Sequence, residues 1–315
     1  VNALTTQAQK LWHVANYVRV PEQERAAEKL IRLSFADTVF FTNSGVEAWE
    51  CGVKIIRRHF WAKGEEQRHR IITARNAFHG RTLAAISAAK SPKLVDGFAP
   101  LADGFDQVPF GDLAALEAAI TPATAAVCLE PVQGEAGIIV PPPGYLKAVR
   151  ALCDYHGLLL FLDEIQCGLG RTGTLWAHEQ HDLKPDVMSV AKALGGGFPV
   201  GACLATEHAA AAMTPGTHGS TYSGNPLAMA VVSETLDMLA EPSVLEHVAH
   251  MGHHLTAGLQ QLIARFPDHL VEGRGVGLLQ GVVLRADSYA SLQEALCARG
   301  LLTVGAGKNI LRFLP

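Results

Sequence analysis

The chain has 315 residues, of which 49% are hydrophobic and 18% charged. The charges nearly cancel, with 26 Lys and Arg against 30 Asp and Glu, so the net charge is −4. This balance excludes the basic stripe of a nucleic-acid-binding surface, and the apolar content excludes wholesale disorder. A chain of this length fits about two domains, or one large α/β domain with an appendage.

Nothing in the sequence indicates a membrane span, a secretion signal or a metal site. Uninterrupted apolar blocks are short, as at residues 158–162, whereas a membrane-spanning helix needs about 20 apolar residues. No basic segment followed by an apolar one opens the chain. The six cysteines are scattered without a C-x-x-C pair, which favours reduced thiols and a cytoplasmic location. His247, His250 and His254 share one helical face, but no H-E-x-x-H motif accompanies them, so a solvated helix face is expected.

Short β-rich runs alternate with helical patterns along the first two thirds of the chain. Strands are predicted at residues 38–41, 70–73, 125–129, 158–162, 187–190 and 200–204. A helical pattern follows the first of these strands through about Arg58. Another, with a period of about 3.6 residues, opens after Pro143 and stops at Gly157. Strands that alternate with helices predict a mainly parallel sheet flanked by helices on both faces.

The pattern changes from about Asn225 onward. Helical patterns at 225–240 and 243–266 precede a glycine-rich turn at 273–277, a strand-like run at 278–284, a helix near 291–299 and a run at 301–304. This region is predicted as a smaller α+β domain. The predicted organisation is therefore a helical segment of an incomplete small domain at 1–20, a large domain at 21–240 and an incomplete C-terminal small domain at 241–315.

Two polar residues follow predicted strands at the sheet edge where α/β proteins bind ligands. Asp163 emerges from the apolar run 158–162, where a buried carboxylate needs a cation or a strong donor, although it could also cap a turn. Lys192 follows the strand 187–190 and precedes three glycines. Such a lysine is paired, or has a depressed pKa suited to Schiff-base chemistry, or extends its ammonium group to solvent.

Two further junctions offer ligand-binding groups with simpler alternatives. Ser44 and Gly45 stand between a strand and a helix, and the N-terminus of a helix suits a phosphate. Ser44 with Glu47 also forms a capping box, which any helix can use. Residues 76–81, with the sequence NAFHGR, offer an aromatic ring, an imidazole and an arginine, although Phe78 alone would more often belong to a core.

The joint order of these features is more specific than any one of them. The strings NSGVEA, NAFHGRT, EPVQGEAG, LDEIQCGLGRTG, AKALGGGFPVGA and HGSTYSGNPLA cover most of the chain. In content, order and spacing they resemble the class III, ornithine/acetylornithine-type aminotransferases. The resemblance implies a fold-type I α/β transferase, pyridoxal 5'-phosphate as cofactor and a homodimer with shared active sites. The resemblance also implies that an N-terminal stretch of the small domain and a piece after Arg312 are expected to be missing from this chain.

The same resemblance implies roles for individual residues. Lys192 holds the cofactor covalently and moves the substrate proton, and Asp163 keeps the pyridinium nitrogen protonated, which makes the ring an electron sink. Phe78 stacks on the ring and Gln166 hydrogen-bonds the ring oxygen. Thr221 is implied to reach the phosphate from the neighbouring subunit. The implied cofactor-binding set is Gly45, Val46, Phe78, Asp163, Glu164, Ile165, Gln166, Lys192 and Thr221.

Val46 is a departure from the family, which usually carries threonine there. The backbone donor is retained and a hydroxyl is lost. A hydrogen bond to a charged group is worth about 1.5–3 kcal/mol, so weaker cofactor binding is expected, offset by the remaining donors.

The implied substrate-binding residues are Arg81, Ser220, Glu135 and Arg312. The two arginines would fork onto carboxylates, and Glu135 would pair with Arg312 when the reacting end lacks an α-carboxylate. Arg312 could instead form a salt bridge with no catalytic role.

The motifs at 166–173 and 191–199 are most similar to those of acetylornithine aminotransferases. That reaction converts N-acetylornithine and 2-oxoglutarate to N-acetylglutamate 5-semialdehyde and glutamate, in arginine biosynthesis. Ornithine, succinylornithine and 4-aminobutyrate aminotransferases remain alternatives. So do mutases and racemases that use the same lysine and aspartate, and an inactive fragment of such an enzyme.

Overall fold

The computed structural model of the protein describes residues 1–285 and 289–315. The strands of the large sheet are β1 (Thr38–Thr42), β2 (Arg70–Ala74), β3 (Phe105–Val108), β4 (Thr124–Leu129), β5 (Leu159–Asp163), β6 (Val187–Val190) and β7 (Gly201–Ala205). The helices are α1 (Asn2–Ala8), α2 (Pro21–Arg32), α3 (Gly45–Ala62), α4 (Leu83–Ala89), α5 (Pro92–Val95), α6 (Leu113–Ala118), α7 (Tyr145–His156), α8 (Glu207–Ala210), α9 (Pro226–Leu239), α10 (Pro242–Arg265) and α11 (Tyr289–Cys297). Short 3-10 turns η1 (Ala177–His181) and η2 (Lys192–Gly195), and strands β8 (Leu270–Val276), β9 (Leu279–Leu284), β10 (Val304–Ala306) and β11 (Ile310–Phe313), complete the described elements.

The large sheet has the strand order β1-β7-β6-β5-β4-β2-β3. Strands β3, β2, β4, β5 and β6 pair in parallel, whereas β7 runs antiparallel to both β6 and β1. The mainly parallel sheet predicted from the sequence is therefore confirmed. The reversal of β7 follows from its short connection to β6, which lacks the long crossover that a parallel neighbour requires.

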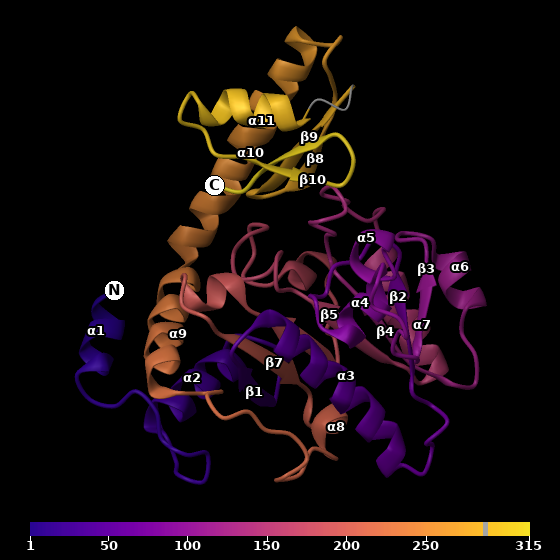
Figure 1. The fold of residues 1–315 in the computed structure, drawn as a ribbon, viewed down its shortest axis with the longest axis vertical. Coiled ribbons are helices and arrows are strands. Elements are labelled where there is room, and N and C mark those ends of the chain that lie inside the picture. Colours follow the sequence, from indigo (N-terminus) through magenta and orange to yellow (C-terminus); the bar gives the residue numbers. More distant parts are fainter. Residues whose placement is uncertain (286–288) are drawn as a thin grey trace.

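Helices cover both faces of this sheet, as predicted (Figure 1). Along β4, Ala126 and Cys128 pack in the same cluster as Trp49 of α3, while Val127 and Leu129 pack with Val149 of α7. The alternation follows from the two-residue period of a strand. Helix α7 ends at Gly157, whose φ of +60° is the left-handed conformation that glycine adopts most readily.

The C-terminal part forms a second, antiparallel sheet with the order β10-β11-β9-β8. Helix α10 runs from the end of α9 toward this sheet and packs on β8, and α11 packs against β10 (Figure 1). The smaller α+β region is confirmed, but the turn predicted at residues 273–277 is shorter than expected. Residues 273–276 belong to β8, which pairs with β9, and Gly275 lies against the β9 backbone; Gly277 begins the turn between the two strands. Strands β3 and β11 were not predicted.

At the start of the chain, α1 packs against α9 (Figure 1). The first 20 residues therefore have a structural partner within the chain, which the sequence did not indicate. The predicted domain boundaries at residues 20 and 240 stay a prediction. Among the described helices, none is long and apolar enough to cross a membrane.

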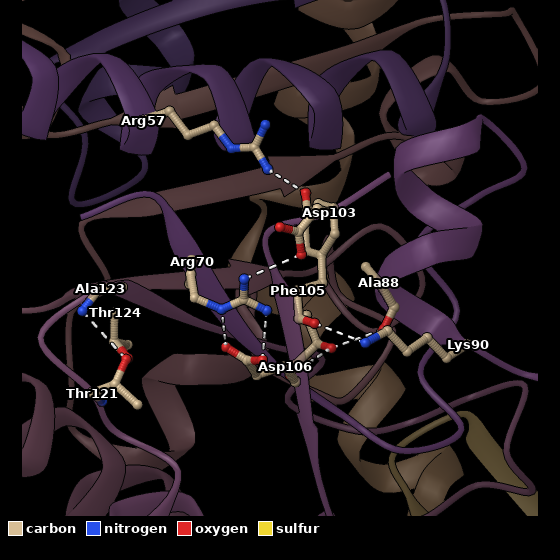
Figure 2. A network of polar contacts seen from close by, with 11 residues as sticks. Arg57, Arg70, Ala88, Lys90, Asp103, Phe105, Asp106, Thr121, Ala123 and Thr124 are labelled. Atoms are coloured by element: carbon tan, nitrogen blue, oxygen red, sulfur yellow. Dashed lines mark hydrogen bonds and ion pairs between the residues drawn. The ribbon is translucent and has the colours of Figure 1, made fainter. Parts of the chain in front are cut away.

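A polar network holds the outer strand β3 against the sheet (Figure 2). Arg70 on β2 donates two parallel hydrogen bonds of 2.8 Å to Asp106 on β3 and a third of 3.1 Å to Asp103. Lys90, after α4, donates to the carbonyl of Phe105 at 2.9 Å. These contacts attach a strand that has a sheet neighbour on one side only.

Candidate active site

Several predicted functional residues lie at the carboxyl edge of the central parallel strands. Asp163 is the last residue of β5, and its neighbour across the sheet is Ser189 of β6. Lys192 comes two residues after the end of β6, and Leu129 at the end of β4 pairs with Leu162. Because parallel strands end on the same side of a sheet, their following residues gather around one cavity.

This cavity has a volume of about 430 Å³, which is within the range of small-ligand sites. Its lining residues are Asn43, Ser44, Gly45, Val46, Phe78, His79, Gly80, Glu130, Asp163, Ile165, Gln166, Ala191, Lys192, Gly197, Phe198, Pro199 and Val200. The set contains seven of the nine cofactor-binding residues predicted from the sequence. These come from segments that are far apart along the chain, so only the fold brings them together.

The Asp163 carboxylate is held by two donors. His79 Nδ1 lies 2.7 Å from Asp163 Oδ2, and the Ile165 amide donates to Oδ1 at 3.1 Å. Asp163 is 3% exposed and the His79 side chain is fully buried, with its ring stacked on Trp49 at a centroid distance of 5.1 Å. The Asp163 carboxylate therefore has a fixed orientation before any ligand is bound.

Lys192 lies at the start of η2 with a φ of +47°, a conformation that costs a non-glycine residue energy and is common at functional sites. Desolvation lowers the pKa of Lys192 below its ordinary value, although Asp163, Glu135 and Glu130 counteract this effect. No carboxylate within the described residues forms an ion pair with its ammonium group. A lysine of lowered pKa without an ion-pair partner is suited to act as an amine nucleophile.

The N-terminus of α3 forms another wall of the cavity. Ser44 caps this helix, because its hydroxyl accepts from the Glu47 amide at 3.4 Å. The reciprocal half of the predicted capping box is absent among the described residues, since the Glu47 carboxylate accepts from the Asn43 amide instead. Within the described residues, the amides of Gly45 and Val46 have no hydrogen-bond partner. A Cβ on Gly45 would lie 3.0 Å from Ile165 Cδ1, so a larger residue would crowd this wall. Free amides and the positive end of the helix dipole suit a phosphate.

Glu135, Gln166 and Arg312 form a connected group beside the cavity. Arg312 on β11 contacts Glu135 Oε1 at 2.7 Å and donates to Gln166 Oε1 at 3.2 Å, while Gln166 Nε2 donates to Glu135 at 3.1 Å. Burial alone would raise the pKa of Glu135, but the hydrogen bonds from Arg312 and Gln166 outweigh it and lower that pKa. A Cβ on Gly134 would lie 1.3 Å from Gln166 Oε1, so only glycine permits this approach.

Some predicted site residues do not reach the cavity within this chain. The Glu164 carboxylate instead accepts from the backbone amides of Ala177 and His178 and from His178 Nδ1, at 2.7–2.9 Å. Arg81 and Thr221 are exposed outside the cavity lining. Ser220 is connected to it indirectly, because its hydroxyl accepts from Asn43 Nδ2 at 2.9 Å.

Among the polar lining residues, the sequence analysis assigned no role to Asn43, His79 and Glu130. Glu130 comes directly after β4, and Asp163 is the last residue of β5, so the same strand-end argument would have found Glu130. The Glu130 Oε2 atom accepts from the Phe78 amide at 3.1 Å. His79 was noted only as an imidazole within a motif, and no sequence pattern pairs it with Asp163.

The known proteins that resemble this chain agree with this geometry. The sequence pattern of the family described as Aminotransferase class-III matches residues 1–315. The chain belongs to the class III aminotransferases. It is 52% identical to an acetylornithine aminotransferase of Agrobacterium fabrum over the whole chain and 79% of that relative. It is 51% identical to one of Rhodobacter capsulatus over the whole chain and 80% of that relative.

Solved structures of aminotransferases also superpose on the whole chain. The N-acetylornithine aminotransferase of Stenotrophomonas maltophilia is 39% identical, with a TM-score of 0.86 over 79% of its length. The ornithine aminotransferase of Toxoplasma gondii is 32% identical, with a TM-score of 0.96 over 76% of its length. A second structure of that ornithine aminotransferase is described with pyridoxal phosphate at the active site. The fold-type I assignment, the aminotransferase activity and the dependence on pyridoxal phosphate are thereby confirmed.

The cavity of this aminotransferase fits that cofactor. It provides a free amine on Lys192, an oriented carboxylate on Asp163 and unpartnered amides at the start of α3. These groups correspond to the aldehyde, the ring nitrogen and the phosphate of the cofactor. When bound, pyridoxal phosphate supplies an electron-poor ring that stabilises a carbanion on the substrate.

Proposed function

We propose that this aminotransferase transfers the amino group of N-acetylornithine to 2-oxoglutarate and produces N-acetylglutamate 5-semialdehyde and glutamate. The identity of about half of the residues to acetylornithine aminotransferases supports this substrate. The observation that carries the proposal is the pairing of Arg312 with Glu135 beside the cavity. An arginine that a glutamate can hold or release suits an enzyme whose two substrates differ in a carboxylate near the reacting carbon.

In this proposal each residue has a defined task. Lys192 Nζ holds the cofactor and takes the proton from the substrate carbon, because its lowered pKa makes the free amine accessible. The Asp163 carboxylate, oriented by His79, would bind the protonated ring nitrogen. Glu135 covers Arg312 while the acyl-ornithine is bound and releases it to the carboxylate of 2-oxoglutarate or glutamate. Arg81 is proposed to bind the second carboxylate.

We further propose that the enzyme is a homodimer in which Thr221 serves the site of the partner. The segment before α2 lies against the loop that carries Thr221, because Asn16 donates to the Ser220 carbonyl at 2.7 Å. Exposed aromatic side chains gather on these two segments: Trp12 is 64%, Tyr17 91% and Tyr222 60% exposed. Clustered exposed aromatic residues favour a protein interface. A monomeric mass in light scattering of the purified holoenzyme would contradict this part of the proposal.

The test of the reaction is the visible absorption spectrum of the purified holoenzyme. We expect a yellow band that N-acetylornithine bleaches and 4-aminobutyrate bleaches much less, with the Lys192→Ala variant as a control without the band. Labelled 2-oxoglutarate should then give labelled glutamate, which no mutase or racemase produces. A band that responds to 4-aminobutyrate or ornithine but not to N-acetylornithine would refute the substrate while leaving the cofactor site intact.

A matched variant tests the role of Glu135. Glu135→Gln keeps the shape and the contact with Gln166 but removes the negative charge opposite Arg312. We expect kcat/KM to fall about tenfold, or 1.4 kcal/mol, for N-acetylornithine and to change little for glutamate. Equal losses for both donors would contradict the proposed gate.

A further inference from the structure

Glu130 is a cavity-lining carboxyl group that none of the steps above uses. It follows β4 directly, and the pairing of Leu129 with Leu162 places Glu130 beside Asp163 at the ends of neighbouring strands. Glu130 is 5% exposed. A carboxyl group that is buried next to another one costs free energy unless it has a function or a compensating contact.

The contact that Glu130 makes is to the backbone of Phe78. Its Oε2 atom accepts from the Phe78 amide at 3.1 Å. Over residues 1–285 and 289–315, its other oxygen has no hydrogen-bond partner. The loop that carries Phe78 begins with Arg75, whose carbonyl accepts from Gln133 Nε2 at 3.0 Å, and continues with Asn76 at a φ of +62°. Through this contact, Glu130 holds the backbone of Phe78, which lines the cavity.

The charges around Glu130 determine its protonation. The charged groups that act on Glu130 are Asp163 on β5, Glu135 in the loop after β4 and Lys192 on η2, and His79 contacts Asp163. Burial first, and the Asp163 carboxylate second, raise the pKa of Glu130 well above its ordinary value, against the smaller effects of the Phe78 amide and Lys192. Two adjacent carboxyl groups in a desolvated site do not both ionise readily, and Asp163 is the one that has two donors.

We propose that Glu130 is a positioning residue of the cofactor site: as a neutral carboxylic acid, it anchors the Phe78 amide, and with it the Phe78 ring, without adding a second negative charge beside Asp163. This inference rests on the proposed function and on the expectation from the sequence that the Phe78 ring stacks on the cofactor. It predicts that the shape and acceptor of the Glu130 side chain matter, while its capacity to carry a negative charge does not.

The test compares Glu130→Gln, which keeps an acceptor oxygen, with Glu130→Leu, which removes it. Each apoenzyme is titrated with pyridoxal phosphate, and the circular dichroism of the bound cofactor reports its stacking. The pH dependence of cofactor incorporation reports the deprotonation of Lys192. Glu117→Leu, on the exposed face of α6, is the control for glutamate replacement as such.

For Glu130→Gln we expect a cofactor dissociation constant within about twofold of that of wild type and an unchanged pH midpoint of incorporation. For Glu130→Leu we expect binding about tenfold weaker, the scale of one lost buried hydrogen bond, and an altered dichroism band. Should Glu130→Leu not fold, Glu130→Asp takes its place, because the shorter chain cannot reach the Phe78 amide. It is expected to give the same loss.

Two results would overturn the proposal. If Glu130 is ionised in wild type, Glu130→Gln removes a negative charge near Lys192, so the Lys192 pKa and the pH midpoint of incorporation fall. If Phe78 needs no anchor, Glu130→Leu or Glu130→Asp binds the cofactor as wild type does. Failure of the wild-type apoenzyme to bind pyridoxal phosphate would instead refute the cofactor site itself, so the two failures are distinguishable.

Discussion

Replacing Val46 by threonine tests how this site holds the cofactor phosphate. Val46 is the second residue of α3. No described residue hydrogen-bonds its amide or that of Gly45, so both are available to bind an anion. The Ser44 hydroxyl at this helix start accepts from the Glu47 amide, so it still has a proton to donate. A threonine at position 46 would add a second side-chain donor beside the backbone amides.

The expected gain in the free energy of cofactor binding is the contribution of a new hydrogen bond minus a loss of apolar burial. A hydrogen bond to a charged phosphate is worth about 1.5–3 kcal/mol. The exchange of a methyl for a hydroxyl forfeits about 0.8 kcal/mol of apolar burial. This loss is real, because Val46 Cγ2 lies so close to Gly80 that a Cβ there would be 2.4 Å away. Val46→Thr should thus bind pyridoxal phosphate about 1 kcal/mol, or roughly fivefold, more tightly.

The assay is a titration of the apoenzymes with pyridoxal phosphate and, in parallel, with pyridoxal, which lacks the phosphate. The fivefold gain should appear only with pyridoxal phosphate, since the new hydroxyl lies at the phosphate end of the site. Val46→Ala, which removes methyl groups without adding a donor, separates packing from hydrogen bonding and should not tighten either ligand. An equal gain for pyridoxal, or no gain for pyridoxal phosphate, would refute the reasoning.

Three further variants test the described contacts. His79→Phe leaves buried Asp163 with the Ile165 amide as its remaining donor, so chemical denaturation of the apoenzyme should give a free energy of unfolding lower by about 2 kcal/mol. Glu135→Gln should destabilise the fold at neutral pH. The pKa of Glu135 is lowered in the folded state, so its contribution to the free energy of unfolding is complete above its ordinary pKa of 4.5. That contribution disappears as the pH falls through the folded-state pKa. The Tm values of variant and wild type should therefore converge in acid. Arg70→Met should lower the free energy of unfolding by about 1 kcal/mol, the upper end of the range for a partly exposed ion pair. A larger loss would mean that β3 detaches from the sheet (Figure 2).

The large sheet was predictable because its central strands carry a strong signal. Residues of β4 and β5 are apolar on both faces and buried on both, so their sequences alone mark them as central strands. The outer strand β3 escaped prediction because its middle residues are Asp106 and Gln107, which bind neighbouring side chains and carbonyls instead of a core. In β8, exposed residues and glycines similarly hide a strand whose register is determined by its pairing with β9.

The site was predictable where a residue follows a strand of the parallel sheet, and less so elsewhere. Asp163 and Lys192 follow apolar strands, so topology alone brings them to the same edge. His79 is different, because its contact with Asp163 depends on the path of the loop after β2 and on the ring of Trp49 against which it stacks. Side-chain partners of this kind are decided by packing in three dimensions, and no local pattern encodes them.

Arg312 shows most clearly what the fold adds to the sequence. It lies on β11 of the second sheet, yet its guanidinium contacts Glu135 and Gln166, which follow strands of the large sheet. It is 6% exposed, so it has little access to water as an alternative partner. A substrate carboxylate that draws Arg312 away from Glu135 must therefore replace a buried, charge-assisted contact between the two sheets. If Glu135 and Arg312 act as the proposed gate, substrate exchange would for this reason be coupled to how the small sheet is held against the large one.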